Sequence, residues 1–445
     1  MEEKKGTAPL KPRDSFTSKW GFIMAAVGSA VGMANVWAFP YRTAKYGGAS
    51  FLIPYLICLV ILMVTGVSAE IAFGRWGKTG PVGTFRRALT MKNKSLKEIG
   101  WIPVIGIFGI GTGYAVIMGW VLRYLWGSIS GAVMTTQNTG AYFGAICGPF
   151  GSLPWHLVAL AIAFVIMIAG VSKGIEKVSK VMMPLFYVCF IYMAIRVAFI
   201  PGATEGYKYL FVPDWKFMAD PKTWMFALGQ CFFSLSLGGA GTLVYGSYFS
   251  EKEDVINASI NIAVFDTLAA LLAALVVIPA VFAFKFDLAS GPPLMFITLP
   301  AIFQEMAGGQ IFAIIFFVAI FFAAVTSIIN LFEPPIEALV QKLNMKRTSS
   351  IAIVATLATI IGLFLENADL IGGWMDLMSV YVVPFGAAIV AIIFFWVMDK
   401  KFVLEQYQLG RKKSVPEWLY PLGKYVFSAI AILVVVLGIV FGGIG

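Results

Sequence analysis

Long apolar segments recur along this 445-residue chain, and they decide what it can fold into. Eleven of them are long enough to cross a bilayer as helices, near residues 20–43, 50–73, 98–126, 153–171, 176–200, 222–246, 256–284, 307–341, 350–366, 372–398 and 420–443. Hydrophobic residues make up 59% of the chain and charged residues 13%, and no soluble domain of this length could bury so much apolar surface. The sequence therefore predicts an all-α polytopic membrane protein with eleven transmembrane helices.

Basic residues lie in every second connection between these segments. They cluster before residue 20, in 75–97 and in 400–413, whereas 124–172 and 348–399 contain no Lys or Arg. This distribution predicts an N-terminus on the cytoplasmic side of the plasma (inner) membrane, with residues 1–19 as a cytoplasmic tail. The net charge of +10 then reflects topology, so the expected partner is the lipid bilayer and no nucleic acid.

Two of the apolar segments are interrupted by glycine and hydroxyl residues. The first contains Gly28, Gly32 and Asn35, and the second contains Ser234, Ser236, Gly238, Gly239 and Gly241. Unwound backbone at bilayer depth is costly unless it lines a cavity, where freed carbonyl and amide groups can bind a ligand. Paired breaks in two halves of one chain indicate the binding site of a transporter.

The interrupted segments begin two sets of five spans, residues 20–200 and 222–398. Because five is odd, the second set is inserted upside down relative to the first. The sequence therefore predicts two inverted five-helix repeats, with discontinuous first and sixth helices and an eleventh helix (420–443) outside the symmetry.

Carboxylates inside the spans are candidates for function because a charge in lipid is expensive. For Glu70 a structural cap or hydrogen bond is the favoured interpretation, whereas mid-span Asp266 favours function. No Lys or Arg lies at comparable depth, so the carboxylate of a zwitterionic ligand would need helix N-termini and a bound cation.

The available oxygen ligands suit an alkali cation better than a transition metal. They are backbone carbonyls and the side chains of Asn35, Ser234, Asp266, Thr326 and Ser327. Sodium coupling follows as a hypothesis, and the alternative is that Ser and Thr only hydrogen-bond neighbouring helices.

Catalytic motifs are missing from the sequence. His156 is the only histidine, which excludes a multi-histidine metal site and argues against a hydrolase triad. Gly77-Lys78-Thr79 resembles the end of a phosphate loop, but Ala72 stands where the first glycine is required. We therefore expect a protein that is not an enzyme.

Several stretches resemble signature motifs of the neurotransmitter:sodium symporter family. They are RDSFTSKWGFIMAAVGSAVGMANVWAFPY (13–41), GGASFLIPY (47–55), GYAVIMGW (113–120), LGQCFFSLSLG (228–238) and FFAAVTS (321–327). The resemblance covers essentially the whole chain and fits the bacterial eleven-helix subgroup, with a leucine-transporter-like fold. It implies sodium-coupled symport by alternating access.

The resemblance implies roles for particular residues. The first sodium site would use Ala30, Asn35, Ser234 and Asp266. The second sodium site would use Gly28, Val31, Ala323, Thr326 and Ser327. The substrate site would use Ala30, Gly32, Ile110, Tyr114, Phe233, Ser236, Gly239, Ser327 and Leu331. The gates would use Arg13, Phe16, Tyr248, Gly174, Pro184 and Asp376.

Three positions sharpen the expected substrate. Gly32 stands where amine-transporting members have Asp, which favours a ligand with its own carboxylate, an amino acid. Gly239 stands where many members have Phe or Met, which enlarges the pocket for a bulky or aromatic side chain; the alternative is that it only lets helices approach closely. Asp266 stands where many members have Asn, and this fixed carboxylate should make chloride unnecessary.

The gates depart from the family pattern. Ala38 replaces the usual outer arginine, and Arg42, one helical turn further on, could reach toward Asp376. Gln341 replaces the acid expected at the inner latch. Gly174 and Pro184 match a family signature for unwinding the cytoplasmic half of the fifth span, which would give water a path to the second sodium site.

The sequence thus predicts a sodium-coupled, chloride-independent symporter that imports hydrophobic or aromatic amino acids with two sodium ions, as a monomer or loose dimer. A proton-coupled or exchange carrier of the same fold is one alternative. A ligand sensor or channel is the other.

Overall fold

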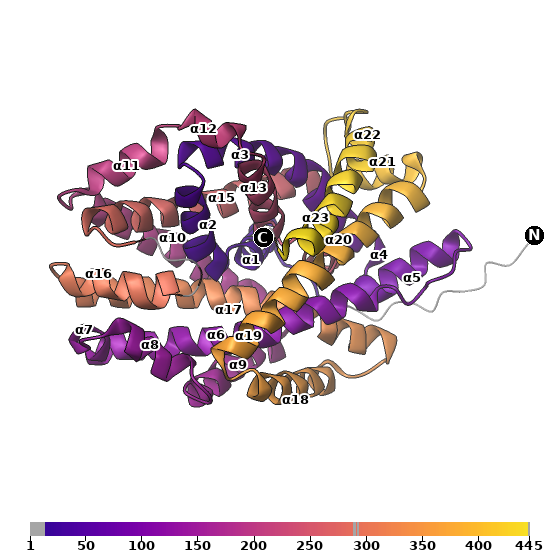
Figure 1. The fold of residues 1–445 in the computed structure, drawn as a ribbon. Coiled ribbons are helices and arrows are strands. Elements are labelled where there is room, and N and C mark those ends of the chain that lie inside the picture. Colours follow the sequence, from indigo (N-terminus) through magenta and orange to yellow (C-terminus); the bar gives the residue numbers. More distant parts are fainter. Residues whose placement is uncertain (1–13, 288–290, 292, 444–445) are drawn as a thin grey trace, which may run out of the picture.

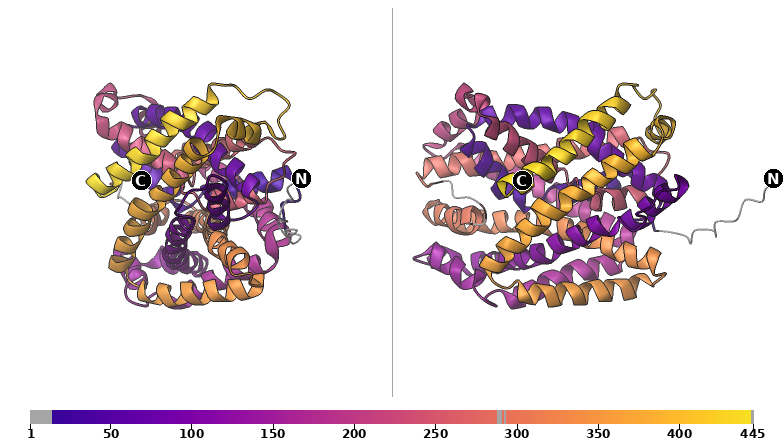
Figure 2. Two further views of the ribbon diagram at one scale, coloured as in Figure 1. Left: turned by 90° about the vertical axis from the view of Figure 1, so that its right-hand side faces the viewer. Right: turned by 45° about the vertical axis from the view of Figure 1, so that its right-hand side comes forward.

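The fold is that of a computed structural model, which describes residues 14–287, 291 and 293–443. All regular elements in this part of the chain are helices, and the long ones lie side by side in one bundle (Figures 1 and 2). Figure 1 shows α6 in the lower half of the bundle, between α17 above and α9 below, and α18 along the lower edge. The most apolar window of α6 is 83% buried inside the protein and that of α18 only 28%, so α18 turns most of its surface toward lipid.

Eight helices of the described part are long and apolar enough to cross a membrane. They are α3–η1–α4 (Ala49–Gly77), α6 (Trp101–Ser130), η2–α10 (Val171–Ala198), α15 (Val255–Ala283), α17 (Gly309–Lys342), α18 (Arg347–Phe364), α19–η4–α20–η5 (Ala368–Val397) and α22–η6–α23 (Leu419–Phe441). The bent pair α1 (Lys19–Ala30) and α2 (Met33–Lys45) makes a ninth span.

Two predicted spans fall outside that set. Helix α9 (Leu153–Ile168) has only 16 residues, and the second interrupted segment consists of α13 (Pro221–Ser234) and α14 (Gly241–Ser247). The all-α polytopic architecture is confirmed. The total of eleven spans and the division into repeats at 20–200 and 222–398 stay predictions.

Short helices cover the two ends of the bundle. They are α5 (Pro81–Met91), α7 (Ala132–Thr135), α8 (Thr139–Cys147), α11 (Ala203–Phe211), α12 (Trp215–Ala219), η3–α16 (Leu294–Glu305) and α21 (Lys400–Gln408). In Figure 1, α7, α8, α11 and α16 gather at the left-hand end, whereas α5 and α21 lie toward the right.

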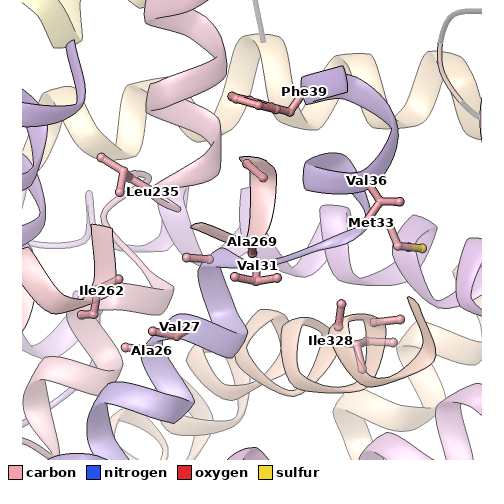
Figure 3. Packing of buried hydrophobic residues seen from close by; sticks show 14 of the residues in the cluster. Ala26, Val27, Val31, Met33, Val36, Phe39, Leu235, Ile262, Ala269 and Ile328 are labelled. Atoms are coloured by element: carbon pink, nitrogen blue, oxygen red, sulfur yellow. The ribbon is translucent and has the colours of Figure 1, made fainter. Parts of the chain in front are cut away.

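Both predicted helix breaks are present. Helices α1 and α2 meet at an angle of 56° across Val31 and Gly32, whose backbone is extended. Figure 3 shows Val31 on this non-helical link, with Val27 before it and Met33 after it. The second break spans residues 235–240, where Ser236 and Gly239 have φ of +52° and +70°. Since α1 packs against α10, α15 and α17, the first break lies in the interior of the bundle.

Candidate functional site

A cavity of about 480 Å³ is lined by both helix breaks. Eight of the nine residues predicted for the substrate site line it: Ala30, Gly32, Ile110, Tyr114, Phe233, Ser236, Ser327 and Leu331. They come from α1, the two breaks, α6, α13 and α17. The structure therefore brings together residues that are up to about 300 positions apart in the sequence.

The ninth residue, Gly239, departs from the expectation. It does not line the cavity, and a Cβ added to it would lie 2.5 Å from the carbonyl oxygen of Gly386 on α20 (Val383–Ile392). Its φ of +70° is a conformation that residues with a side chain rarely adopt. The glycine thus permits close approach of two backbones, which favours the alternative given by the sequence over an enlarged pocket.

One hydrogen bond links the second break to the end of α1, and another links the start of α2 to α6. The Ser236 hydroxyl donates to the carbonyl oxygen of Ser29 over 3.1 Å. On the other side, the Met33 amide donates to the Tyr114 hydroxyl over 3.0 Å. Because Met33 is the first residue of α2, the positive end of that helix points into the cavity beside Tyr114.

The residues predicted for the first sodium site form one buried cluster. The Ser234 hydroxyl donates to Asp266 Oδ2 over 2.6 Å, and Asn35 Nδ2 donates to Oδ1 over 2.8 Å. Asn35 Oδ1 accepts the Gly32 amide over 2.9 Å. Ala30 lines the adjoining cavity together with Asn35 and Ser234. Polar side chains from three segments, Asn35, Ser234 and Asp266, therefore meet at one place, where the Asp266 carboxylate supplies the negative charge.

The residues predicted for the second sodium site form another cluster, where α1 packs against α17. The Ser327 hydroxyl lies 3.0 Å from the Gly28 carbonyl oxygen and 3.1 Å from that of Val31. Thr326 Oγ1 lies 3.2 Å from the carbonyl oxygen of Ala323. A Cβ at Gly28 would lie 2.6 Å from the Thr326 side chain, so α1 and α17 are closely packed here. All five residues predicted to bind the second sodium ion through oxygen atoms therefore lie next to one another.

Glu70, for which the sequence favoured a structural cap or hydrogen bond, binds the backbone of the second break. This wholly buried residue of α4 (Ser68–Gly77) accepts the amide of Gly238 over 3.1 Å and that of Gly239 over 2.8 Å. It satisfies two backbone donors that the second break leaves without a helical partner. Its depth in the second span was the only signal that could have identified it.

At one mouth of the cavity, Arg42 pairs with a residue other than Asp376, the partner that the sequence suggested. Arg42 Nη1 donates to Gln230 Oε1 of α13. Asp376 is exposed and lines the same cavity, but no ion pair joins it to Arg42 among the described residues. Arg42 thus links the half-helices α2 and α13. Ala38, an uncharged residue, also lines the cavity.

At the opposite end, the predicted latch residues are close together. The Phe16 ring packs edge-on against Phe22, Tyr245 and Tyr248. The Tyr248 hydroxyl donates to Glu333 Oε1 over 2.7 Å, and Arg347 donates to both oxygens of Glu333 over 2.7 and 2.8 Å.

Two other latch predictions have different outcomes. Arg13 lies outside the described residues. The segment from Gly174 to Pro184 is helical, with Gly174 in the π-helical turn η2 (Val171–Glu176) and Pro184 inside α10 (Lys177–Ala198). The structure therefore shows this segment in its helical form, and the unwinding that the family signature implies stays a prediction.

A model of the sodium:neurotransmitter symporter family matches residues 13–148 and 143–442. The chain belongs to this family. The uncharacterised sodium-dependent transporter YhdH of Bacillus subtilis is 36% identical over 321 residues, which cover 72% of this chain and 70% of YhdH. The bovine sodium-dependent neutral amino acid transporter B(0)AT2 is 29% identical over 304 residues, or 61% of this chain and 41% of that one.

The crystal structure of MhsT in complex with L-phenylalanine has the same fold. It superposes with a TM-score of 0.86 over 96% of this chain and all of MhsT, at 32% identity. These similarities confirm the predicted class: a membrane transporter of the sodium:neurotransmitter symporter family, sodium-dependent and not an enzyme.

Proposed function

We propose that this protein imports hydrophobic, preferably aromatic, amino acids together with two sodium ions and without chloride. The proposal includes an N-terminus in the cytoplasm and a location in the plasma (inner) membrane. The observation that carries it is the pair of oxygen clusters on either side of the first break, at Asp266 and at Ser327. Neutral and singly charged oxygen ligands at this spacing favour an alkali cation.

The lining of the cavity supports an amino-acid substrate. Near the breaks it combines the Tyr114 hydroxyl and the N-terminus of α2, which suit a carboxylate, with apolar side chains of Ile110, Phe233 and Leu331. The complex of MhsT contains phenylalanine, and B(0)AT2 is named for neutral amino acids. A large apolar side chain would fill the half of the cavity that faces α6 and α17.

Substrate and ion would bind together because each neutralises the other. The substrate carboxylate would lie beside Gly32 and Tyr114, next to the cluster of Asn35, Ser234 and Asp266. Moving one sodium charge inward releases about 2.3 kcal/mol per 100 mV of membrane potential, so two ions would drive steep accumulation. The Asp266 carboxylate would replace the anion that balances charge in chloride-dependent transporters.

Uptake into proteoliposomes tests this function. Labelled phenylalanine should accumulate against its gradient with sodium outside, and replacing sodium by potassium or choline should abolish accumulation. Replacing chloride by gluconate should leave accumulation unchanged. Accumulation that persists without sodium and follows a proton or amino-acid gradient would establish a proton-coupled or exchange carrier. Binding without any flux would establish a sensor.

A further inference from the structure

One buried carboxylate joins the start of α1 to the start of the η2–α10 span. Glu176, on η2, is 1% exposed. Its Oε2 accepts the Thr17 amide over 2.7 Å, and its Oε1 accepts the Thr17 hydroxyl over 2.7 Å and the Ser18 hydroxyl over 2.9 Å. Lys180, one turn further along α10, approaches Oε1 to 2.6 Å. Four donors from two distant segments thus converge on one side chain.

The first turn of α1 is shaped around this carboxylate. A Cβ added to Gly21 would lie 2.0 Å from Glu176 Oε1, so only glycine lets the helix backbone come this close. Ser18 also caps α1, because its hydroxyl accepts the Gly21 amide over 3.0 Å. The same serine therefore caps the beginning of α1 and donates to Glu176.

A second contact of the same segment supports the first. Asp14 Oδ2 accepts the Val171 amide over 2.6 Å and the Ser172 amide over 3.3 Å. These amides open η2, so the segment before α1 covers both the beginning and the end of this π-helical turn. Residues 14–18 and η2 form one hydrogen-bonded unit.

We propose that Glu176 is a positioning residue that clasps the inner end of α1 to η2 and keeps the inner pathway closed while the central site is occupied. The proposal rests on the proposed transport function. Helix α1 carries the Gly28 and Val31 carbonyls, so the clasp also fixes their position against Ser327. Releasing the clasp frees both α1 and η2 at one step.

The chemistry of the clasp makes its release cooperative. A dehydrated carboxylate is stable only while its donors remain, and charge-assisted hydrogen bonds are the stronger kind. Loss of one donor leaves the charge poorly compensated, which favours entry of water and loss of the others. The inner end therefore has two distinct states, clasped and hydrated.

Cysteine labelling from the two sides of the membrane tests the clasp. Ala26 of α1 lines a void of about 10 Å³, between the central cavity and the end that carries Glu176, together with Phe22, Ser236 and Tyr245. Ala38 lines the opposite mouth. Each is replaced by cysteine, as Ala26→Cys or Ala38→Cys, in a chain whose native Cys58, Cys147, Cys189 and Cys231 are alanine. Labelling by a membrane-impermeant maleimide is then measured in oriented proteoliposomes.

We expect Glu176→Gln to speed labelling of Ala26→Cys from the inner side about tenfold, the equivalent of one charge-assisted hydrogen bond, and to slow that of Ala38→Cys from the outer side. Thr17→Val, which keeps Glu176 and removes one donor, should act in the same direction. Glu366→Gln removes another buried carboxylate, beside His156, and should change neither rate.

The outcomes separate the clasp from a structural effect and from the transport function. If Glu176→Gln and Thr17→Val leave both rates unchanged, or speed both alike as general loosening would, the clasp is wrong. If sodium does not slow labelling of Ala26→Cys in the otherwise unaltered chain while Glu176→Gln still shifts the two rates in opposite directions, sodium coupling fails and the clasp stands.

Discussion

At the scale of single residues, the site depends on a few side chains whose partners are far away in the sequence. Asp266 is the clearest of them, because its two oxygens receive a hydroxyl and an amide from two other helices. The mid-span position of Asp266 led the sequence analysis to favour a functional role, which stays a prediction. By contrast, the partner of Arg42 and the orientation of Gly239 depend on how α13 and α20 pack, and no local pattern encodes that.

Asp266→Asn should weaken sodium binding by about tenfold or make binding depend on chloride, because the fixed negative charge is lost. Sodium titrations of phenylalanine binding, in chloride and in gluconate, measure both effects. Asp214→Asn, which alters the cap of exposed α12, is the control. Equal sodium midpoints for Asp266→Asn and the unaltered chain in both salts would contradict the assigned charge balance.

Gly239→Ala should lower stability by about 1–3 kcal/mol, because a Cβ there both strains the backbone and meets Gly386. Gly372→Ala is the matched control, since nothing lies within 4 Å of a Cβ at that position. Thermal unfolding in detergent compares the two. A stable Gly239→Ala protein that selects smaller substrates would restore the original expectation that Gly239 enlarges the pocket.

At the scale of helices, the sequence predicted the positions of the helix breaks better than the distant contacts that stabilise the neighbouring segments. The first break falls at Val31 and Gly32, within the run of glycines that indicated it, and the span predicted at 256–284 is observed as Val255–Ala283. The closed π-helical turn η2 was not predicted, because its form depends on contacts with residues 14–18. Local composition shows where a helix weakens, whereas distant partners decide whether it opens.

Glu70→Ala should disrupt the second break, because the amides of Gly238 and Gly239 lose their acceptor at about 1–3 kcal/mol each. Glu70→Gln keeps an acceptor oxygen in the same place and should retain most of the stability. Substrate binding and thermal unfolding of the two variants distinguish a hydrogen-bond role from a role of the charge. A larger loss with glutamine than with alanine would contradict the capping role.

At the scale of the whole molecule, both ligands would bind to one set of helices. Ions and substrate meet around the first break, so their binding energies should be coupled rather than independent. The bundle around them is asymmetric, with α6 buried and α18 facing lipid. The unfolding temperature of the intact protein should therefore depend on whether ions and substrate occupy the site around the first break.

Sodium and phenylalanine together should raise the unfolding temperature by more than the sum of their separate effects. A ligand at a hundred times its dissociation constant adds about 2.7 kcal/mol, and coupling increases this for the pair. Potassium at equal ionic strength is the control. Strictly additive shifts would contradict a shared site for the carboxylate and the first ion.

Ser327 belongs both to the predicted second sodium site and to the wall of the central cavity, and this has a pharmacological consequence. Its hydroxyl bonds the Gly28 and Val31 carbonyls, while the residue also forms part of the wall of the central cavity. A blocker bulky enough to displace that hydroxyl would compete with the amino acid and would also lower the apparent affinity for the cation. Dose–response curves for such a compound would shift with the salt composition of the assay, whereas those of a compound confined to the vestibule near Arg42 would not.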